Sequence, residues 1–222
     1  FVTFHLFLAF VLYQIVKNLW IHFLAYRIGF GVKWNPGYDN WAVITGGTDG
    51  IGLEYAKKLL KIGYSVLLIS RNESKLNAVK NVLQQINSNN HIDSLAIDFT
   101  ERYEIYDEIK RKIDEIEADG KGKIDVLVNN VGMSLDLPLD NFSTFEFELL
   151  SKQINCNLIS CIKMTQIVLP KMIKHKRGVI INIASIAGAL PIPFKPIYSA
   201  TKVFVDQFSM SLNVEYKDKV ND

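Results

Sequence analysis

Apolar and polar positions follow two alternating patterns from Trp41 to the end of the chain. Short apolar runs, which we predict to be strands, occupy residues 41–45, 64–70, 93–99, 123–130 and 178–185. Between these runs apolar residues recur every three or four positions, which predicts amphipathic helices, including a long one over about 145–175 and a last one from near Tyr198. Short buried strands that alternate with helices are typical of a parallel sheet covered on both faces. The pattern therefore predicts an α/β fold with a doubly wound parallel sheet.

The N-terminal segment has a different pattern, because residues 1–16 contain no Asp, Glu, Lys or Arg and the apolar pattern resumes after Lys17 as far as Tyr26. A helix would span about 24 Å over the first part and about 40 Å over the whole, against a hydrocarbon core of about 30 Å. We therefore predict a membrane anchor over residues 1–30, formed by one tilted transmembrane helix, and a linker over residues 31–40. A signal peptide, a hairpin and a helix lying in the membrane plane are the alternatives.

Three observations favour a cytosolic position for the rest of the chain. Basic residues, beginning with Arg27, follow the apolar segment, as the positive-inside rule requires of a cytosolic flank. Cys156 and Cys161 have the spacing of small buried groups on different sides of one helix, and we expect no disulfide between them. A site suited to NADPH, argued below, agrees with the same compartment. The N-x-S sequons at Asn72 and Asn141 are then expected to remain unmodified.

Composition limits the partners and the number of domains. The chain has 222 residues, which is enough for one α/β domain with a sizeable core and a short additional segment. Its formal net charge of +2 gives no argument for a nucleic-acid partner. The four histidines show no metal-ligand spacing, so we expect no metal site.

A glycine-rich turn follows the first predicted strand in WAVITGGTDGIG, residues 41–52. Gly46 lets the chain turn sharply, whereas Gly50 and Gly52 remove side chains where the backbone approaches a ligand and where the helix packs on the sheet. The helix N-terminus would face a phosphate with free N–H groups and its positive dipole end. Glycines alone are weak evidence, but their position between the first strand and the first helix favours a nucleotide phosphate site.

The end of the second predicted strand concerns the choice of cofactor. Sites for NAD usually place an acidic residue roughly 20 residues past the glycines, where it binds the ribose 2′-hydroxyl. Here the sequence is Ser70-Arg71, and the first acidic residue is Glu73. Because a guanidinium pairs well with a 2′-phosphate, Arg71 favours NADP(H). The alternative is that Arg71 is only a solvated surface residue.

A second motif, YSATK, places Tyr198 and Lys202 on one face of a helix, since they are four residues apart. A tyrosine has an unperturbed pKa of about 10, and a neighbouring ammonium lowers it by stabilising the phenolate. Ser185 ends the fifth predicted strand, at the edge where open α/β sheets bind ligands. Although Y-x-x-x-K is common on helix surfaces, the three residues together predict proton transfer to a carbonyl oxygen.

Four motifs occur in order: T-G-x-x-x-G-x-G at 45–52, N-N-x-G at 129–132, Ser185, and Y-x-x-x-K at 198–202. Together they resemble the short-chain dehydrogenases/reductases, and the resemblance covers residues 41–222. It implies a Rossmann-like sheet with strand order 3-2-1-4-5. The family domain continues past the Tyr–Lys helix with two further strands and a substrate loop, so we expect residues 41–222 to be a C-terminally incomplete reductase domain.

The resemblance also implies a role for each matching residue. Tyr198 would be the general acid/base, Ser185 would orient and polarise the carbonyl and bind the substrate, and Lys202 would bind the nicotinamide ribose. Asn157 matches the family asparagine that holds a proton-relay water. The predicted NADP(H)-binding residues are Thr45, Gly46, Gly50, Ile51, Gly52, Arg71, Asp98, Asn129, Tyr198 and Lys202.

Longer strings, among them VLVNNVGMS, CIKMTQIVLP and PIYSATKVFVDQFS, look like one membrane-bound branch of the family. This branch contains very-long-chain 3-oxoacyl-CoA reductases and 17β-hydroxysteroid dehydrogenases of the endoplasmic reticulum. The resemblance implies NADPH-dependent reduction of a ketone on a lipid substrate, either a 3-oxoacyl-CoA or a 17-ketosteroid, by a domain that faces the cytosol. A homodimer through the long helices is left open. The alternative is a non-catalytic, membrane-anchored nucleotide-binding or scaffold protein, although such relatives usually lose the tyrosine, serine or lysine.

Overall fold

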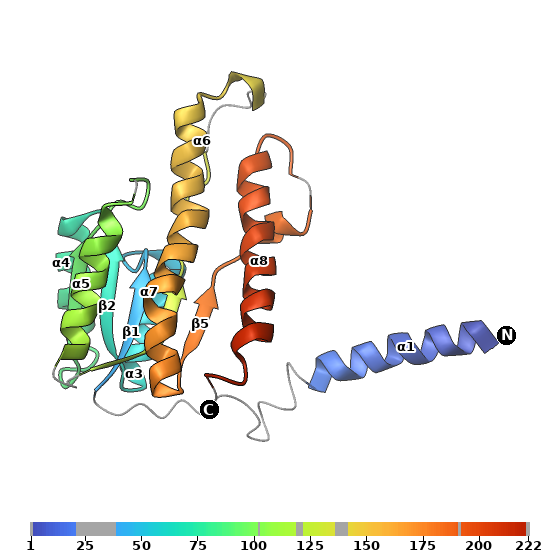
Figure 1. Cartoon of the computed structure of the whole chain (residues 1–222), viewed down its shortest axis with the longest axis horizontal. Coiled ribbons are helices and arrows are strands. Elements are labelled where there is room, and N and C mark those ends of the chain that lie inside the picture. Colours follow the sequence, from blue (N-terminus) through green and yellow to red (C-terminus); the bar gives the residue numbers. More distant parts are fainter. Residues whose placement is uncertain are drawn as a thin grey trace. The chain divides into compact units, whose positions relative to one another are not determined.

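The computed structural model describes residues 2–20, 39–101, 103–118, 122–135, 142–190 and 192–220 (Figure 1). The chain divides into two compact units, Phe1–Trp34 and Asn35–Asp222. The first unit contains helix α1 (Val2–Leu19). Large exposed apolar side chains occur along this helix, namely Leu6, Phe7, Phe10, Leu12, Tyr13, Ile15 and Val16.

The prediction of a transmembrane helix is not confirmed. In the part of the chain that the structure describes, no helix combines the length and the apolar character needed to cross a membrane. The second half of the predicted anchor, residues 21–30, and most of the predicted linker lie outside the described residues. The anchor therefore stays a prediction, and the alternatives to it stay open.

The second unit is built on a five-stranded sheet in the order β3-β2-β1-β4-β5. All four neighbouring pairs are parallel, which confirms the predicted order and the doubly wound class (Figure 1). The strands are β1 (Asn40–Thr45), β2 (Ser65–Ser70), β3 (Ile92–Ala96), β4 (Lys123–Asn129) and β5 (Val179–Asn182). Strands β3 and β5 end earlier than predicted, because the residues that follow them leave the sheet and carry polar groups to its carboxyl edge.

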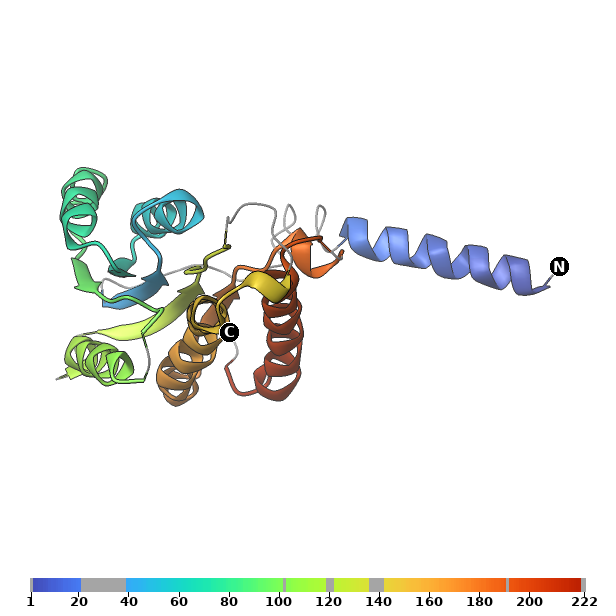
Figure 2. The ribbon, with the colours of Figure 1, turned by 90° about the horizontal axis from the view of Figure 1, so that it is seen from above.

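Helices cover both faces of this sheet (Figure 2). The helices are α3 (Gly50–Lys61), α4 (Glu73–Gln84), α5 (Ile105–Glu117), α6 (Phe147–Ile154), α7 (Ser160–His175) and α8 (Pro196–Tyr216). Alternate residues of the strands belong to two separate apolar clusters. Val43 and Leu67 pack in the cluster that contains residues of α5 and α7, whereas Ile44 and Leu68 pack in the cluster with α3 and α4. The strands are therefore buried on both sides, which explains their continuous apolar sequence.

Polar side chains and a glycine mark the ends of two helices. The Asp49 carboxylate accepts from the Gly50 N–H at 2.8 Å, and the Asn72 carboxamide oxygen accepts from the Lys75 N–H at 2.9 Å. Such contacts satisfy N–H groups that have no partner inside the helix. Gly63, with φ +103°, follows the C-terminal end of α3, where glycine commonly ends a helix. The state of the Asn72 sequon stays a prediction, and Asn141 lies outside the described residues.

The long helix predicted over about 145–175 is interrupted, which the periodic pattern does not reveal. A π-helical turn, η4 (Asn155–Ile159), lies between α6 and α7. The Ser160 hydroxyl donates to the Cys156 carbonyl at 2.5 Å within this region. A π turn inserts one extra residue into the helical repeat and is frequent at functional sites. Here it contains Asn157, one of the predicted catalytic residues.

Both cysteines are buried and unpaired, as predicted. Burial raises the pKa of the Cys156 thiol to about 12 and that of the Cys161 thiol to about 11. The two thiols are therefore protonated at neutral pH and pack as small apolar groups.

Candidate active site

The glycine turn forms an open cradle at the N-terminus of α3. Gly46 has φ +64° and Gly50 has φ +50°, and residues other than glycine rarely adopt these backbone conformations. A Cβ added at Gly50 would meet nothing within 4 Å, so this position faces open space. A Cβ added at Gly52 would lie 2.4 Å from the Gly46 carbonyl oxygen and 2.5 Å from Asn130 Nδ2, so the floor of the cradle is closely packed. Open space at Gly50, at the N-terminus of a helix, together with close backbone packing at Gly52, fits a dinucleotide pyrophosphate.

Thr45 and Asn130 hold this turn in place. The Thr45 hydroxyl donates to the Val128 carbonyl at 3.2 Å and accepts from the N–H groups of Asn130 and Val131, each at 3.0 Å. Asn130 Nδ2 donates to the carbonyls of Thr45 and Gly46, also at 3.0 Å. The sequence prediction named Thr45 but missed Asn130. The available signal was the pair of adjacent asparagines, of which the resemblance selected the first.

That first asparagine, Asn129, is buried inside the domain. Its Nδ2 donates to Asn182 Oδ1 at 2.8 Å and to Thr165 Oγ1 at 3.3 Å, which ties β4 to β5 and to α7. The structure thus gives Asn129 two partners within the domain. Its predicted cofactor contact stays a prediction.

The remaining predicted cofactor residues lie at the carboxyl edge of β1, β2 and β3. Ile51 is exposed in the first turn of α3, and Arg71 is exposed directly after β2. The hydroxyls of Thr48 and Ser70 lie 3.0 Å apart beside them. The Asp98 carboxylate accepts from the Thr100 N–H at 2.9 Å, which shapes the turn after β3. Adjacent parallel strands bring these side chains to one edge, where an open α/β sheet binds its ligand.

Tyr198 and Lys202 lie together in the first half of α8. Lys202 Nζ lies 5.7 Å from the centroid of the Tyr198 ring. Lys202 is buried, and its ammonium donates to the Ile183 carbonyl at 2.8 Å, just past the end of β5. Burial lowers the pKa of Lys202. The structure therefore places the lysine and the tyrosine next to each other, as their spacing of four residues predicts.

Ser185 follows β5 and begins the short 3-10 helix η5 (Ile186–Gly188). Its hydroxyl oxygen accepts from the Ala187 N–H at 3.2 Å. A Cβ added at Gly188 would lie 3.1 Å from the Lys202 carbonyl carbon, so η5 packs directly on α8. This close packing brings the Ser185 turn to the part of α8 that carries the tyrosine and the lysine.

Asn157 connects the π turn to the loop after β4 and to α8. Its Oδ1 accepts from the Met133 N–H at 2.7 Å, and its Nδ2 donates to the Met133 carbonyl at 2.9 Å and to Thr201 Oγ1 at 3.2 Å. A Cβ added at Gly132 would lie 3.4 Å from Asn157 Oδ1 and 3.5 Å from Lys202 Nζ. The structure therefore brings Asn157 close to Lys202, whereas the water-holding role stays a prediction.

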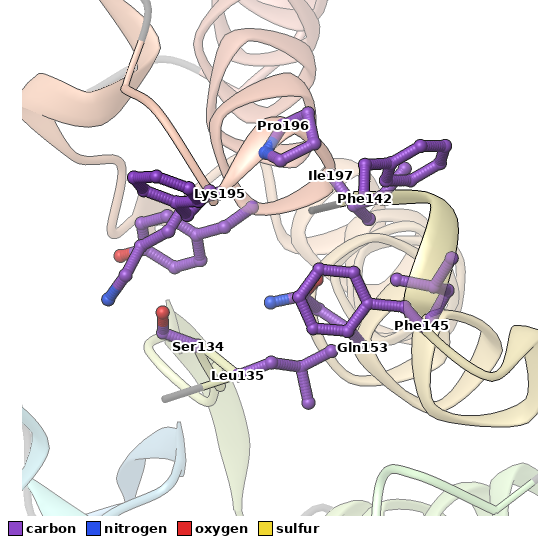
Figure 3. Close-up of a pocket in the computed structure, with 11 residues that line it drawn as sticks. Ser134, Leu135, Phe142, Phe145, Gln153, Lys195, Pro196 and Ile197 are labelled. Atoms are coloured by element: carbon purple, nitrogen blue, oxygen red, sulfur yellow. The ribbon is translucent and has the colours of Figure 1, made fainter. Parts of the chain in front are cut away.

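Tyr198 also lines a pocket that the sequence prediction did not identify (Figure 3). The pocket is open to solvent, and its enclosed part has room for about one water molecule. Most of its lining is apolar, namely Leu135, Phe142, Phe145, Leu150, Phe194, Pro196 and Ile197, and its other polar lining residues are Ser134, Gln153 and Lys195. The available signal was the aromatic cluster FSTFEF, at the helix η3 (Phe142–Thr144) and the start of α6. Tyr198 thus lies beside a narrow pocket with a mainly apolar lining.

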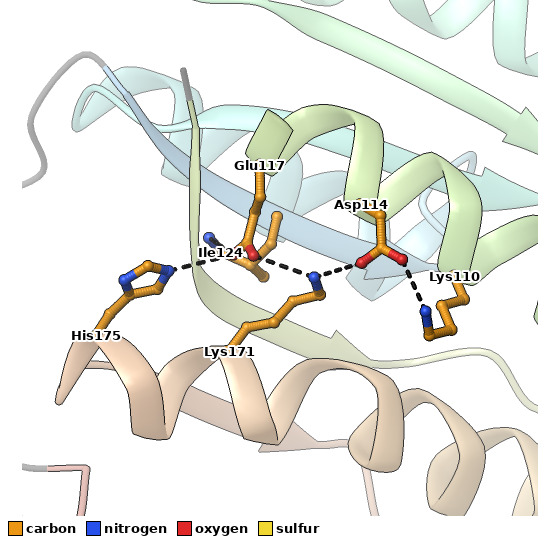
Figure 4. A network of polar contacts seen from close by, with 6 residues as sticks. All are labelled: Lys110, Asp114, Glu117, Ile124, Lys171 and His175. Carbon is orange, nitrogen blue, oxygen red and sulfur yellow. Dashed lines mark hydrogen bonds and ion pairs between the residues drawn. The ribbon is translucent and has the colours of Figure 1, made fainter. Parts of the chain in front are cut away.

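A network of ion pairs away from the pocket joins α5 to α7 and has a structural role (Figure 4). Lys171 on α7 pairs with Asp114 at 2.6 Å and Glu117 at 3.1 Å on α5, and His175 Nε2 lies 3.5 Å from Glu117. Hydrogen bonds from Lys110 and Lys171 lower the pKa of the Asp114 carboxyl. These pairs fix α7 against α5 on one face of the sheet.

The glycine turn at the N-terminus of α3 lies at the carboxyl edge of the sheet, where Ser185, Tyr198 and Lys202 also lie. This combination is typical of one class of protein, the dinucleotide-dependent oxidoreductases. The profile of the short chain dehydrogenase family matches residues 40–221, so the chain belongs to this family.

Comparison with known proteins gives closer relatives. The chain is 41% identical over 220 residues to a very-long-chain 3-oxoacyl-CoA reductase from Mus musculus, which covers 96% of the chain and 66% of the mouse protein. It is 42% identical over 182 residues to a 17-beta-hydroxysteroid dehydrogenase type 3 from Danio rerio, covering 81% of the chain and 56% of that protein. A solved metagenomic short-chain oxidoreductase in complex with NADP superimposes with a TM-score of 0.73 at 30% identity, covering 82% of this chain and 79% of that one. The chain thus spans about two thirds or less of the length of the curated relatives it matches.

Proposed function

We propose that this chain is the cofactor-binding and catalytic domain of an NADPH-dependent reductase that converts the ketone of a 3-oxoacyl-CoA into a hydroxyl group. The observation that carries the proposal is Tyr198, with the buried Lys202 ammonium 5.7 Å from its ring, in the wall of a largely apolar pocket. The apolar lining of the pocket favours a lipid substrate, and the mouse relative is named for this activity. The solved short-chain oxidoreductase in complex with NADP supports the cofactor.

Each site residue has a defined task in the proposed reaction. NADPH, when bound, supplies the hydride that the carbonyl carbon receives. Tyr198 donates its hydroxyl proton to the carbonyl oxygen, so that the ketone becomes a secondary alcohol. Ser185 donates a hydrogen bond to the same oxygen and polarises it. Lys202 stabilises the phenolate that Tyr198 becomes, and solvent then returns the proton.

The open cradle at Gly50 and the exposed Arg71 support NADPH as the cofactor. Arg71→Ala should weaken NADPH far more than NADH, by roughly 10- to 100-fold, because a charge-assisted contact is worth about 1.5–3 kcal/mol. Fluorescence titration gives both dissociation constants. The matched control is Lys61→Ala, which removes an exposed positive charge at the far end of α3. Equal losses for the two cofactors would mean that Arg71 is only structural.

We also propose that the N-terminal segment anchors the protein in the endoplasmic reticulum membrane, with the reductase domain facing the cytosol. The exposed apolar side chains of α1 support a lipid-facing helix, and Arg27 follows the apolar segment. A homodimer through α7 and α8 is an additional hypothesis, which the mass of the detergent-solubilised protein would test.

A single assay tests the proposed reaction and the proposed orientation. Sealed microsomal vesicles that contain the full-length protein receive NADPH and substrate from outside, without detergent. We expect NADPH oxidation with a 3-oxoacyl-CoA, since neither molecule needs to cross the membrane. Activity only after detergent would contradict the cytosolic orientation.

The same assay separates the alternatives. The zebrafish relative makes a 17-ketosteroid the second candidate substrate, and oxidation with the steroid alone would favour it. NADPH binding without turnover of either substrate would favour a non-catalytic protein, although Tyr198, Ser185 and Lys202 are all present.

A further inference from the structure

Ser134 has a buried hydroxyl for which the reaction described so far has no use. Its Oγ is buried and has no hydrogen-bond partner among the residues that the structure describes. Ser134 and Tyr198 line the same pocket, and Figure 3 shows the Ser134 oxygen directed into the space between the labelled side chains. A buried hydroxyl without a partner is unfavourable, and because Ser134 lines the pocket, a ligand group that enters the pocket could supply the missing partner.

The backbone next to Ser134 is held firmly. The Met133 N–H and carbonyl are both bound by Asn157, at 2.7 and 2.9 Å. Gln153, one turn earlier in the helix, donates from Nε2 to the same carbonyl at 3.3 Å. Gln153 is itself buried and lines the pocket. Three side-chain contacts to Met133, the preceding residue, thus fix the position from which the Ser134 hydroxyl reaches the pocket.

The proposed substrate has a group that matches this hydroxyl. A 3-oxoacyl thioester carries two carbonyl oxygens, on carbons separated by one methylene group. Tyr198 and Ser185 are assigned to the ketone oxygen, so the thioester oxygen enters the same pocket without an assigned donor. In surroundings that are mainly apolar, an unpaired carbonyl oxygen is as unfavourable as an unpaired hydroxyl.

We propose that the Ser134 hydroxyl donates a hydrogen bond to the thioester carbonyl oxygen of the substrate. This assignment rests on the proposed function and makes Ser134 a residue that selects 3-oxoacyl thioesters over ketones with a single carbonyl. A site with a buried polar group disfavours an analogue that leaves the group unpaired. Gln153 is a positioning residue in this assignment, because it acts through the Met133 carbonyl.

The test combines two substrates with two enzymes. The substrates are a 3-oxoacyl-CoA and the matching 3-oxoalkyl-CoA thioether, which keeps the ketone and lacks only the thioester oxygen. The full-length protein and its Ser134→Ala variant are compared by kcat/KM. For each enzyme, kcat/KM for the thioester is divided by kcat/KM for the thioether, and the two quotients are then compared. The intrinsic reactivity of each ketone is the same for both enzymes and cancels, so the comparison isolates the contact between Ser134 and the missing oxygen.

We expect Ser134→Ala to lower kcat/KM for the thioester by about ten-fold and to leave the thioether within about two-fold, the scale of one net hydrogen bond. Ser134→Thr, which retains a hydroxyl, should keep the preference for the thioester. The matched control is Ser199→Ala, since Ser199 Oγ is also buried without a partner among the described residues, yet Ser199 is not part of the pocket lining. NADPH affinity, measured for each variant, reports whether the domain is folded.

The possible failures have different signatures. Equal loss on both substrates, or loss on neither, would overturn the role of Ser134 and leave the proposed function intact. A parent protein that does not prefer the thioester over the thioether would overturn it too, even if the alanine variant does not fold. A parent protein that reduces neither substrate would refute the proposed function, and this assignment with it.

Discussion

Replacing Tyr198 by phenylalanine is expected to lower turnover at least about 100-fold, the usual scale for loss of a general acid. The ring and its contact with Lys202, 5.7 Å away, are retained in the variant, so NADPH affinity should change by no more than a few-fold. Single-turnover measurements with saturating NADPH separate the reduction step from product release. The loss should therefore be found in the rate of reduction and not in the binding of the cofactor.

Tyr103→Phe is the matched control for this experiment. It also removes one phenolic oxygen, from a side chain that is 62% exposed and is not among the residues lining the pocket. Its turnover should equal that of the parent protein. Comparable turnover in Tyr198→Phe and Tyr103→Phe would refute the assignment of Tyr198 as the proton donor.

Gly52→Ala is expected to weaken NADPH binding by roughly 10- to 100-fold, the effect of about 1.5–3 kcal/mol of backbone strain. The added Cβ would lie 2.4 Å from the Gly46 carbonyl oxygen, and a backbone atom in a tight turn cannot move aside cheaply. The turn must open, so its N–H groups lose their alignment toward the phosphates. Fluorescence titration measures the loss of affinity, and thermal unfolding without cofactor measures the loss of stability.

Gly178→Ala is the control for the glycine experiment. Its Cβ would lie equally close, 2.4 Å, to Met172 Cγ, which belongs to a flexible side chain at the other end of the domain. This variant should show a lower melting temperature and an unchanged NADPH affinity. If Gly52→Ala behaves like Gly178→Ala, the cradle does not hold the cofactor phosphates.

The fold could be predicted from the sequence because the parallel strands are buried on both faces. Strand β4, for example, has the uninterrupted apolar segment Val126-Leu127-Val128, and each of these side chains is fully buried. The π turn at Asn155–Ile159 was not predicted, because apolar residues such as Ile154, Leu158 and Ile159 are so closely spaced there that a shift of one position in the repeat cannot be recognised. The carboxyl ends of strands were also predicted too long, because Ile183 and Ala184 are apolar but lie beyond the end of β5.

The sequence could predict which site residues lie close together only where those residues belong to the same short motif. Tyr198 and Lys202 are close because one helix carries both, and spacing alone gives that result. The role of Asn130 could not be predicted, because it depends on a turn more than eighty residues earlier in the chain. The pocket lining escaped prediction for a related reason, since Ser134, Phe145 and Ile197 meet only after three segments have folded together.

The long-range bonds of Thr45 and Asn130 have a consequence for the order of folding. These bonds join residues 83 to 86 positions apart, so closing the intervening loop has to precede the final shape of the glycine turn. A chain that has formed only β1, α3 and β2 therefore lacks the support that aligns the turn for phosphate. Cofactor in the surrounding solution would bind poorly to such an early intermediate and would not accelerate its formation. It would instead slow unfolding once β4 has docked, because the bound form must release the dinucleotide before this strand can separate from β1.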